Sequence, residues 1–103
     1  MTQRSAFVLR VRPEKVEAYL DAHRSVWPEM LDALRSAGIR NYTIFRAGNE
    51  MFGYFESDDL DRAASSLASK EVSARWQDAM ADLLEERVPD AGPPRLEEVF
   101  RLD

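Results

Sequence analysis

The chain has 103 residues, of which 45% are hydrophobic, and this length and composition predict one domain, residues 1–103, with a substantial core. Its 14 basic and 19 acidic residues give a formal net charge of −5, which argues against nucleic acid or an anionic membrane as a partner. The chain has no cysteine for disulfides, thiolate nucleophiles or Cys-ligated metals, and its one histidine cannot form a His-rich metal site, so we expect no metal and no cofactor.

The first element that the sequence predicts is a short strand, residues 5–11, in which β-prone residues alternate between two faces. Pro13 comes directly after it and suits the first turn of a helix. The apolar run at this end is short and interrupted by Arg10, so it resembles neither a signal peptide nor a membrane span. The cytoplasm is therefore the expected compartment.

A helical pattern follows at about residues 13–37, where apolar residues recur at intervals of three and four. Gly38 suits the position that closes such a helix. Because the pattern is longer than an average helix of about 11–12 residues, we expect Pro28 either to divide it or to bend it.

The second half of the chain predicts a hairpin, a pair of helices and a last strand. Two β-prone runs, residues 39–46 and 51–56, are separated by residues typical of a turn. Helical patterns then cover residues 59 to about 68 and residues 70 to about 86. A loop at residues 88–94 precedes the predicted last strand, residues 96–102.

This order of elements is typical of the split β-α-β, or ferredoxin-like, fold. It predicts the α+β class, with a four-stranded antiparallel sheet that carries its helices on one face. The other face would be polar if it met water, yet neighbouring positions such as Ile44 and Phe45 are both apolar. We therefore expect a homodimer in which a second copy covers the open sheet face, a dimeric α+β barrel. The alternative is that these strands simply collect β-forming residues.

The histidine, His23, lies one helical turn after Tyr19 and one turn before Trp27, so the three side chains share a helix face. A histidine on an apolar stripe is more often a core residue than a catalyst. Buried phenol, indole and imidazole groups nevertheless need polar partners, and either a small hydroxylated ligand or ordered water would supply them. This face is the first candidate site.

Two more aromatic residues are candidates for the same site. Tyr42 belongs to the predicted hairpin, and Trp76 belongs to the inward stripe of the last predicted helix. Taken alone, each is best interpreted as an ordinary packing residue. If Tyr42 points toward the helices, however, it faces the same space as His23. Aromatic faces with a few polar groups around one space are typical of a carbohydrate site.

These residues recur in an ordered pattern that resembles the L-rhamnose mutarotase family over nearly the whole chain. The pattern begins with AFVLRVRP and continues with Y-x3-H-x3-WPE, which starts at Tyr19. Its later parts are G-x2-NY-x-I from Gly38, RW-x3-M from Arg75, and EVF-x-L from Glu98. The block that joins the tyrosine, the histidine and WPE is the most specific of these.

The resemblance implies a small dimeric α+β barrel that interconverts the anomers of L-rhamnose or a related 6-deoxy sugar without a cofactor. It implies the following roles: His23 as the general acid and base, Tyr19, Tyr42 and Trp76 as sugar contacts, and Trp27 as a supporting residue. The family has a second Trp after Trp76, where this chain has Gln77, which we expect to contact the sugar through its amide. The chemistry agrees, because ring opening needs only proton transfers, and an imidazole with a pKa near ~6.5 serves in both directions.

Two other functions stay open at this point. Dimeric α+β barrels also include cofactor-free monooxygenases and haem-degrading enzymes, which place a single histidine among aromatic residues. The third interpretation is a non-catalytic module that binds a small ligand or dimerises, with His23 as a core residue.

Overall fold

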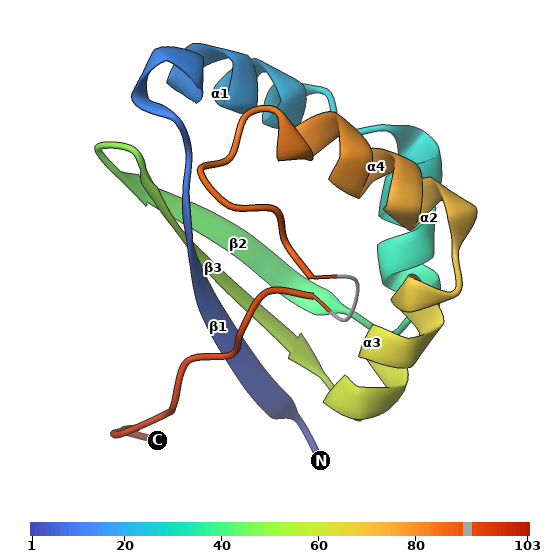
Figure 1. The fold of residues 1–103 in the computed structure, drawn as a ribbon. Coiled ribbons are helices and arrows are strands. Elements are labelled where there is room, and N and C mark those ends of the chain that lie inside the picture. Colours follow the sequence, from blue (N-terminus) through green and yellow to red (C-terminus); the bar gives the residue numbers. More distant parts are fainter. Residues whose placement is uncertain (90–91) are drawn as a thin grey trace.

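The computed structural model describes residues 1–89 and 92–103, which form an antiparallel sheet with helices packed against one face (Figure 1). The elements in chain order are β1 (Gln3–Arg10), the 3-10 helix η1 (Pro13–Lys15), α1 (Val16–Arg24), α2 (Pro28–Ser36), β2 (Arg40–Ala47), β3 (Glu50–Ser57), α3 (Leu60–Ala68) and α4 (Glu71–Ala81). The predicted α+β class, with its helices on one face of the sheet, is confirmed. Of the loop predicted at residues 88–94, residues 90–91 lie outside the described part.

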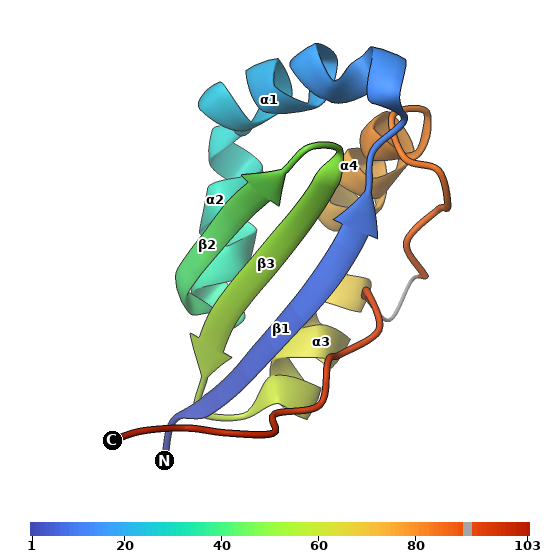
Figure 2. The ribbon, with the colours of Figure 1, turned by 90° about the vertical axis from the view of Figure 1, so that its left-hand side faces the viewer.

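The sheet has three strands in the order β1-β3-β2. The expected four-stranded sheet is wrong, because residues 96–102, all of which the structure describes, form no strand. The Leu96 N–H donates a hydrogen bond of 2.8 Å to the Ala6 carbonyl, and the tail then crosses the start of β1 instead of following its edge (Figure 2). A strand needs a ladder of such bonds along a neighbouring edge, so β-forming side chains are not sufficient.

The long helical pattern at residues 13–37 is divided at Pro28, which was expected either to divide it or to bend it. α1 ends at Arg24 and α2 begins at Pro28, where a proline costs little because the first helical N–H has no intrahelical partner. His23 therefore lies in the last turn of α1, and Trp27 lies at the N-cap position of α2.

The last helix is shorter than predicted, because α4 ends at Ala81 and not near residue 86. The chain beyond it pairs with the extension of β1: Val11 and Leu84 form an isolated antiparallel bridge. The Glu85 N–H also donates to the Arg10 carbonyl at 2.9 Å, and Arg12 Nε donates to the Leu84 carbonyl at 3.1 Å. These hydrogen bonds take the chain out of the helix although its side-chain pattern continues.

The inner face of the sheet packs closely against the helices. Phe7 on β1 is opposite Gly53 on β3, and its ring lies over that glycine, in the space that a Cβ would fill. The main core cluster continues from here between the sheet and α1, α2 and α4, and its buried members are Val11, Tyr19, Met30, Met51, Trp76, Met80, Leu84 and Val88. Phe7 itself packs within the inner face of the sheet, where its ring neighbours are Tyr42 and Phe55.

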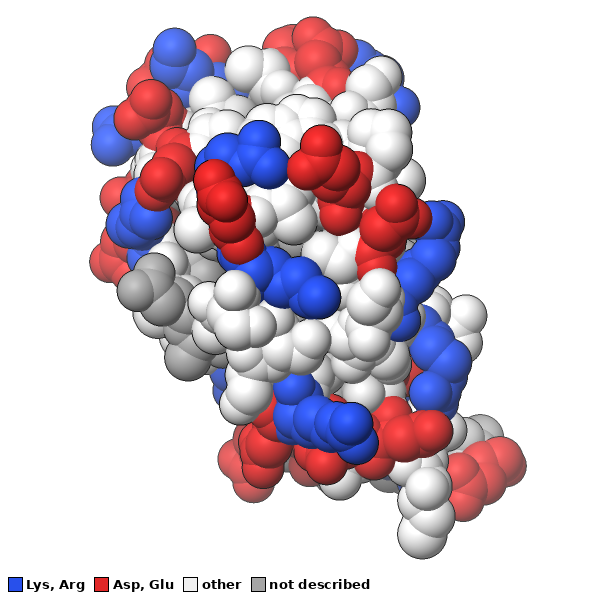
Figure 3. Space-filling view, turned by 90° about the vertical axis from the view of Figure 1, so that its right-hand side faces the viewer, with Lys and Arg blue, Asp and Glu red and all other residues white. Residues whose placement is uncertain are grey.

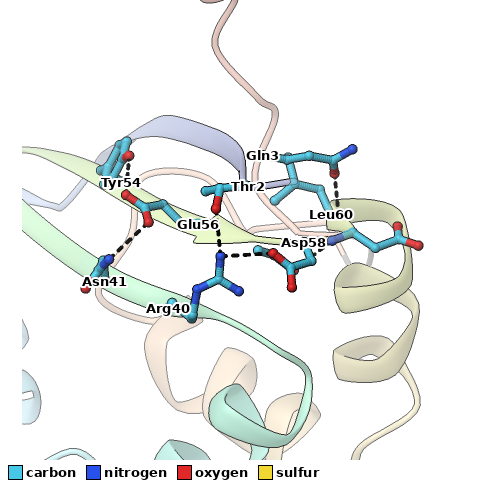
Figure 4. Close-up of polar contacts among 10 residues, drawn as sticks. Thr2, Gln3, Arg40, Asn41, Tyr54, Glu56, Asp58 and Leu60 are labelled. Atoms are coloured by element: carbon cyan, nitrogen blue, oxygen red, sulfur yellow. Dashed lines mark hydrogen bonds and ion pairs between the residues drawn. The ribbon is translucent and has the colours of Figure 1, made fainter. Parts of the chain in front are cut away.

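A β-bulge at the start of β2 sets which of its residues face the helices. The pairing with β3 shifts by one residue between Arg40 and Thr43, and Asn41 adopts a left-handed conformation with a φ of 51°. Asn41 also donates a hydrogen bond of 3.0 Å to Glu56, which accepts a second one from Tyr54 at 2.6 Å (Figure 4). The bulge thus lets Arg40 and Thr43 both lie on the outer face while Tyr42 between them turns inward.

No helix covers the outer face of the sheet in Figure 2. Phe45 and Phe52 are paired across β2 and β3 on this face and are 66% and 38% exposed. The helix-side surface is different, because Figure 3 shows basic and acidic side chains interspersed there, with pairs such as Arg75 and Glu29 at 3.1 Å. The exposed Phe45 and Phe52 agree with the apolar residues expected on the open face, which they share with charged residues such as Arg40 and Glu56.

Candidate active site

His23 is held by the helix that carries it. Its Nδ1 lies 2.8 Å from the Tyr19 carbonyl oxygen, one turn earlier on α1. Because a carbonyl oxygen only accepts, Nδ1 carries the proton, and a neutral imidazole then has its lone pair on Nε2. In the part of the chain that the structure describes, Nε2 has no hydrogen-bond partner. The side chain is therefore fixed in one tautomer, with its basic nitrogen available.

Aromatic rings enclose His23 from two sides. It stacks on Tyr19 with ring centroids 4.2 Å apart, and it meets Trp76 of α4 edge-to-face at 5.4 Å. Trp27 meets the same Trp76 edge-to-face at 5.1 Å. The two helices made by the break at Pro28 thus bring His23 and Trp27 against one indole, which fixes the position of the imidazole.

The surroundings shift the pKa values of three residues. Burial lowers the pKa of His23 below its ordinary 6.5, although the hydrogen bond to the Tyr19 carbonyl opposes this shift. Burial raises the pKa of Tyr19 to about 12. Burial, with a smaller contribution from nearby Tyr19, also raises the pKa of Tyr42. At neutral pH, the imidazole is therefore mostly a neutral base, and both phenols are hydrogen-bond donors.

A cavity of about 460 Å³ lies between the inner sheet face and the helices, a size typical of small-molecule sites. His23, Tyr42, Trp76 and Gln77 all line it, although they come from three separate elements, α1, β2 and α4. Tyr42 points toward the helices as its proposed role requires. The residue is 41% exposed, and its ring packs on Phe7 and Phe55 with centroids 6.1 and 5.3 Å away.

Tyr19 and Trp27 are placed behind this lining and are absent from the described residues that form it. Tyr19 is only 4% exposed and lies against the His23 ring, while Trp27 packs on Trp76. This position suits the supporting role predicted for Trp27. For Tyr19, direct contact with a sugar stays a prediction.

Three polar residues that sequence reasoning did not select also line the cavity: Ser5, Ser73 and Arg95. Ser73 lies one turn before Gln77 on α4, a spacing that could have identified it. Ser5 alternates with Phe7 on β1, and this too is visible in the pattern. Arg95 belongs to an irregular segment without a periodic signal, and it pairs with Asp61 at 3.3 Å.

A search of the described residues finds no cluster of three or more His, Asp or Glu side chains that could hold a metal ion. None of the described helices has the length and apolar character that crossing a bilayer requires. The polar side-chain groups among the described lining residues are an imidazole, a phenol, an indole N–H, an amide, two hydroxyls and one ion-paired guanidinium. This set suits hydrogen bonding to hydroxyl groups and transfer of protons.

The chain is similar to known proteins over nearly its whole length. The family model for L-rhamnose mutarotase matches residues 4–102. An L-rhamnose mutarotase of Oceanobacillus iheyensis is 32% identical over 98% of this chain and 99% of its own, and one of Shigella flexneri is 37% identical over 96% and 97%. The crystal structure of an L-rhamnose mutarotase from Formosa agariphila superposes with a TM-score of 0.80 at 31% identity, over 98% of this chain and 99% of that one.

Proposed function

Because this chain belongs to the L-rhamnose mutarotase family, we propose that it interconverts the α and β anomers of L-rhamnose or a related 6-deoxy aldopyranose through general acid–base catalysis by His23. As a member of that family, the chain is a sugar isomerase. The observation that carries the role of His23 is its fixed tautomer at a cavity that Tyr42, Trp76 and Gln77 also line.

The proposed reaction begins with a proton transfer at the anomeric centre. Nε2 of His23 removes the proton of the anomeric hydroxyl, the bond between C1 and the ring oxygen breaks, and the ring oxygen takes up a proton. Rotation about the C1–C2 bond then presents the other face of the aldehyde, and closure by the reverse transfers gives the other anomer. A positioned acid or base of this kind typically contributes about 10²–10⁴-fold in rate.

The other lining residues are proposed to hold the sugar. The Trp76 indole offers a flat face to the C–H groups of the ring, and Gln77 offers both a donor and an acceptor to hydroxyl groups. Because its pKa is raised, the phenol of Tyr42 keeps its proton and can donate to a sugar oxygen. Either Tyr19 or water is the second proton carrier.

The walls of the cavity support a 6-deoxy sugar. Many of its lining residues are aliphatic, among them Leu34, Ile39, Leu60, Ala63 and Leu67. A 6-deoxy sugar carries a methyl group at C6, whereas its parent hexose carries a hydroxymethyl group that would lie unpaired against such walls. We expect kcat/KM for L-rhamnose to exceed that for L-mannose, its 6-hydroxy counterpart, by roughly 10- to 100-fold. Equal values would contradict this choice of substrate class.

Saturation-transfer NMR on equilibrated L-rhamnose, L-fucose and other aldopyranoses tests the function directly, because it measures exchange between the two anomeric signals. We expect the wild-type protein to accelerate exchange and His23→Gln to lower the rate by about 10²–10⁴-fold. The matched control is Arg24→Gln on the neighbouring exposed residue, whose partner is Asp21. Failure of folded wild-type protein to accelerate any exchange would refute the function, and full activity in His23→Gln would refute the role of that residue.

We also propose that the chain forms a homodimer through the outer face of the sheet. Phe45 and Phe52 are exposed there, and half-buried Ala6 and Val8 extend the same face along β1. Covering such side chains removes apolar surface from water, which is the main favourable contribution to association. The charged helix side seen in Figure 3 offers no comparable surface.

A further inference from the structure

Ser5 is a buried hydroxyl without a partner. The residue is only 6% exposed, and its Oγ has no hydrogen bond within the described residues. Buried polar atoms are nearly always paired in folded proteins, so an exception asks for an explanation. The second buried serine of the sheet, Ser57, follows the rule, because its Oγ accepts a hydrogen bond of 3.2 Å from the Asp59 N–H.

The side chain of Ser5 belongs to the lining of the cavity. It lies on the inner face of β1, opposite Phe55 on β3 and two residues before Phe7. The Ser5 hydroxyl is free to rotate about its Cα–Cβ bond among staggered positions, and it can both donate and accept. A polar group on the ligand can therefore donate a hydrogen bond to this hydroxyl or accept one from it.

Ser5 marks the end of the cavity that lies away from His23. The start of β1 is tied to the start of α3, because Gln3 Oε1 accepts a hydrogen bond of 2.7 Å from the Leu60 N–H. Figure 1 shows α1, whose last turn holds His23, and α3 toward opposite ends of the sheet. Tyr42 lies toward the Ser5 end, since its ring stacks on Phe55, the residue opposite Ser5 on β3.

None of the described residues donates a hydrogen bond to the Ser5 hydroxyl or accepts one from it. Phe7, Phe55 and Leu60 are apolar, and Arg95, the charged member of the lining, is paired with Asp61. An unpartnered hydroxyl among such groups costs stability in the ligand-free protein. A residue kept there at a cost to folding is typical of a functional site.

We propose that Ser5 Oγ hydrogen-bonds a ring hydroxyl of the bound sugar that lies across the ring from the anomeric carbon, on C3 or C4, and so helps to select the sugar. This inference rests on the proposed mutarotase function and adds a contact to it. With the anomeric centre at His23, the far side of the sugar points to the end of the cavity where Ser5 lies. Ser5 is thus a contact for binding and plays no part in the proton transfers.

The variant Ser5→Ala tests this contact, with Ser57→Ala as its matched control. For Ser5→Ala we expect KM for L-rhamnose to rise roughly 3- to 10-fold with kcat unchanged, because a hydrogen bond made equally in the ground and transition states is lost. The ligand-free variant should melt at the same temperature as wild type or higher, because a buried unpaired group has been removed. Ser57→Ala should show the reverse, a lower melting temperature and an unchanged KM.

Deoxy sugars identify the hydroxyl that Ser5 contacts. The probes are the 3-deoxy and 4-deoxy derivatives of L-rhamnose, measured by the same anomer exchange. We expect wild-type protein to have a higher KM for one of them than for L-rhamnose. For that derivative, Ser5→Ala and wild type should have the same KM. If Ser5→Ala raises KM for both derivatives by the same factor as for L-rhamnose, a hydrogen bond to the hydroxyl on C3 or C4 is refuted.

The outcomes separate this inference from the proposed function. Active wild-type protein together with an unchanged KM in Ser5→Ala would overturn the role of Ser5 alone. A marked loss of thermal stability in ligand-free Ser5→Ala would also overturn it, because the hydroxyl would then have a structural partner. Wild-type protein that exchanges no sugar would overturn the proposed function and the Ser5 contact together.

Discussion

Replacing Gly53 with alanine tests how the sheet packs against its covering layer. An added Cβ would lie 2.1 Å from Cζ of Phe7 and within 2.6 Å of two further atoms of that ring. Separations this short are far below contact distance, so the ring must move. Phe7 is 2% exposed and packs on Tyr42 and Phe55, with centroids 6.1 and 6.3 Å away, so every direction of movement disturbs a packed neighbour.

The expected cost is that of overpacking a core, about 1–3 kcal/mol. For a domain of this size, that cost lowers the melting temperature by roughly 5–20 °C. Because Phe7 and Tyr42 both line the cavity, displacement of the ring should also raise KM for the sugar. Thermal unfolding followed by circular dichroism gives the melting temperature, and anomer exchange measured at several sugar concentrations gives KM.

Two further variants make this prediction sharp. Gly48→Ala meets no atom within 4 Å and incurs only the strain of a φ of 61°, so it should lower stability modestly and leave KM unchanged. Phe7→Leu shortens the side chain over Gly53, so Gly53→Ala should cost less in a Phe7→Leu background than in wild type. Additive effects in that cycle, or a Gly53→Ala protein that melts within about 2 °C of wild type, would refute the packing argument.

The remaining predictions concern the bulge, a helix cap, the dimer and the histidine. Asn41→Val should lower the free energy of unfolding in urea by about 1–2 kcal/mol, since φ is 51° there, and Asn41→Gly should lower it less; equal losses would contradict the role of the bulge. Asp59 Oδ1 accepts from the Arg62 N–H at the start of α3, so Asp59→Ala should cost about 1 kcal/mol in the same assay and leave KM unchanged; an unchanged free energy would be the contrary result. Phe45→Glu should yield a monomer in sedimentation velocity, and an unaltered sedimentation coefficient would argue against the proposed interface. Because burial lowers the pKa of His23, kcat/KM should fall with decreasing pH around a midpoint under 6.5. The unfolded chain binds that proton more readily, so stability should also fall as pH drops from about 6.5 toward the folded pKa; a midpoint above 6.5 would contradict both expectations.

The sequence predicted those features that follow from local pattern. The one-turn spacing of Tyr19 and His23 on α1, the break at Pro28 and the hairpin all depend on neighbouring residues. Trp27 was expected on the same helix face, which is wrong, because the break places it at the N-cap of α2. The sequence left open whether Tyr42 faces the helices, and the structure places it in the lining of the cavity. The other predictions that failed depend on distant pairing: α4 stops early because Leu84 meets Val11, and the tail is no strand because it crosses β1.

The residues that line the cavity also divide into those that the sequence could predict and those that it could not. The aromatic residues and Gln77 could be selected by chemical type and by resemblance to a family. Ser5 could not, because a serine in a strand is unremarkable until its lack of a partner and its place in the lining are known. The inward turn of Tyr42 also needs the left-handed conformation of Asn41, which no periodic pattern reveals.

The two outer strands of the sheet carry a safeguard against uncontrolled association. β1 has Arg4 and Arg10 near its two ends, and β2 has Arg40 and Arg46, while the central strand β3 has no arginine or lysine. Unpaired backbone groups along a sheet edge can recruit the edge of another molecule and so begin an aggregate. Charged side chains on an edge strand disfavour such pairing, because an edge-to-edge contact would have to remove these arginines and their ion-pair partners Glu98, Glu50 and Asp58 from water. This leaves the proposed face-to-face dimer, a pairing that closes on itself, as the favoured way for two copies to associate.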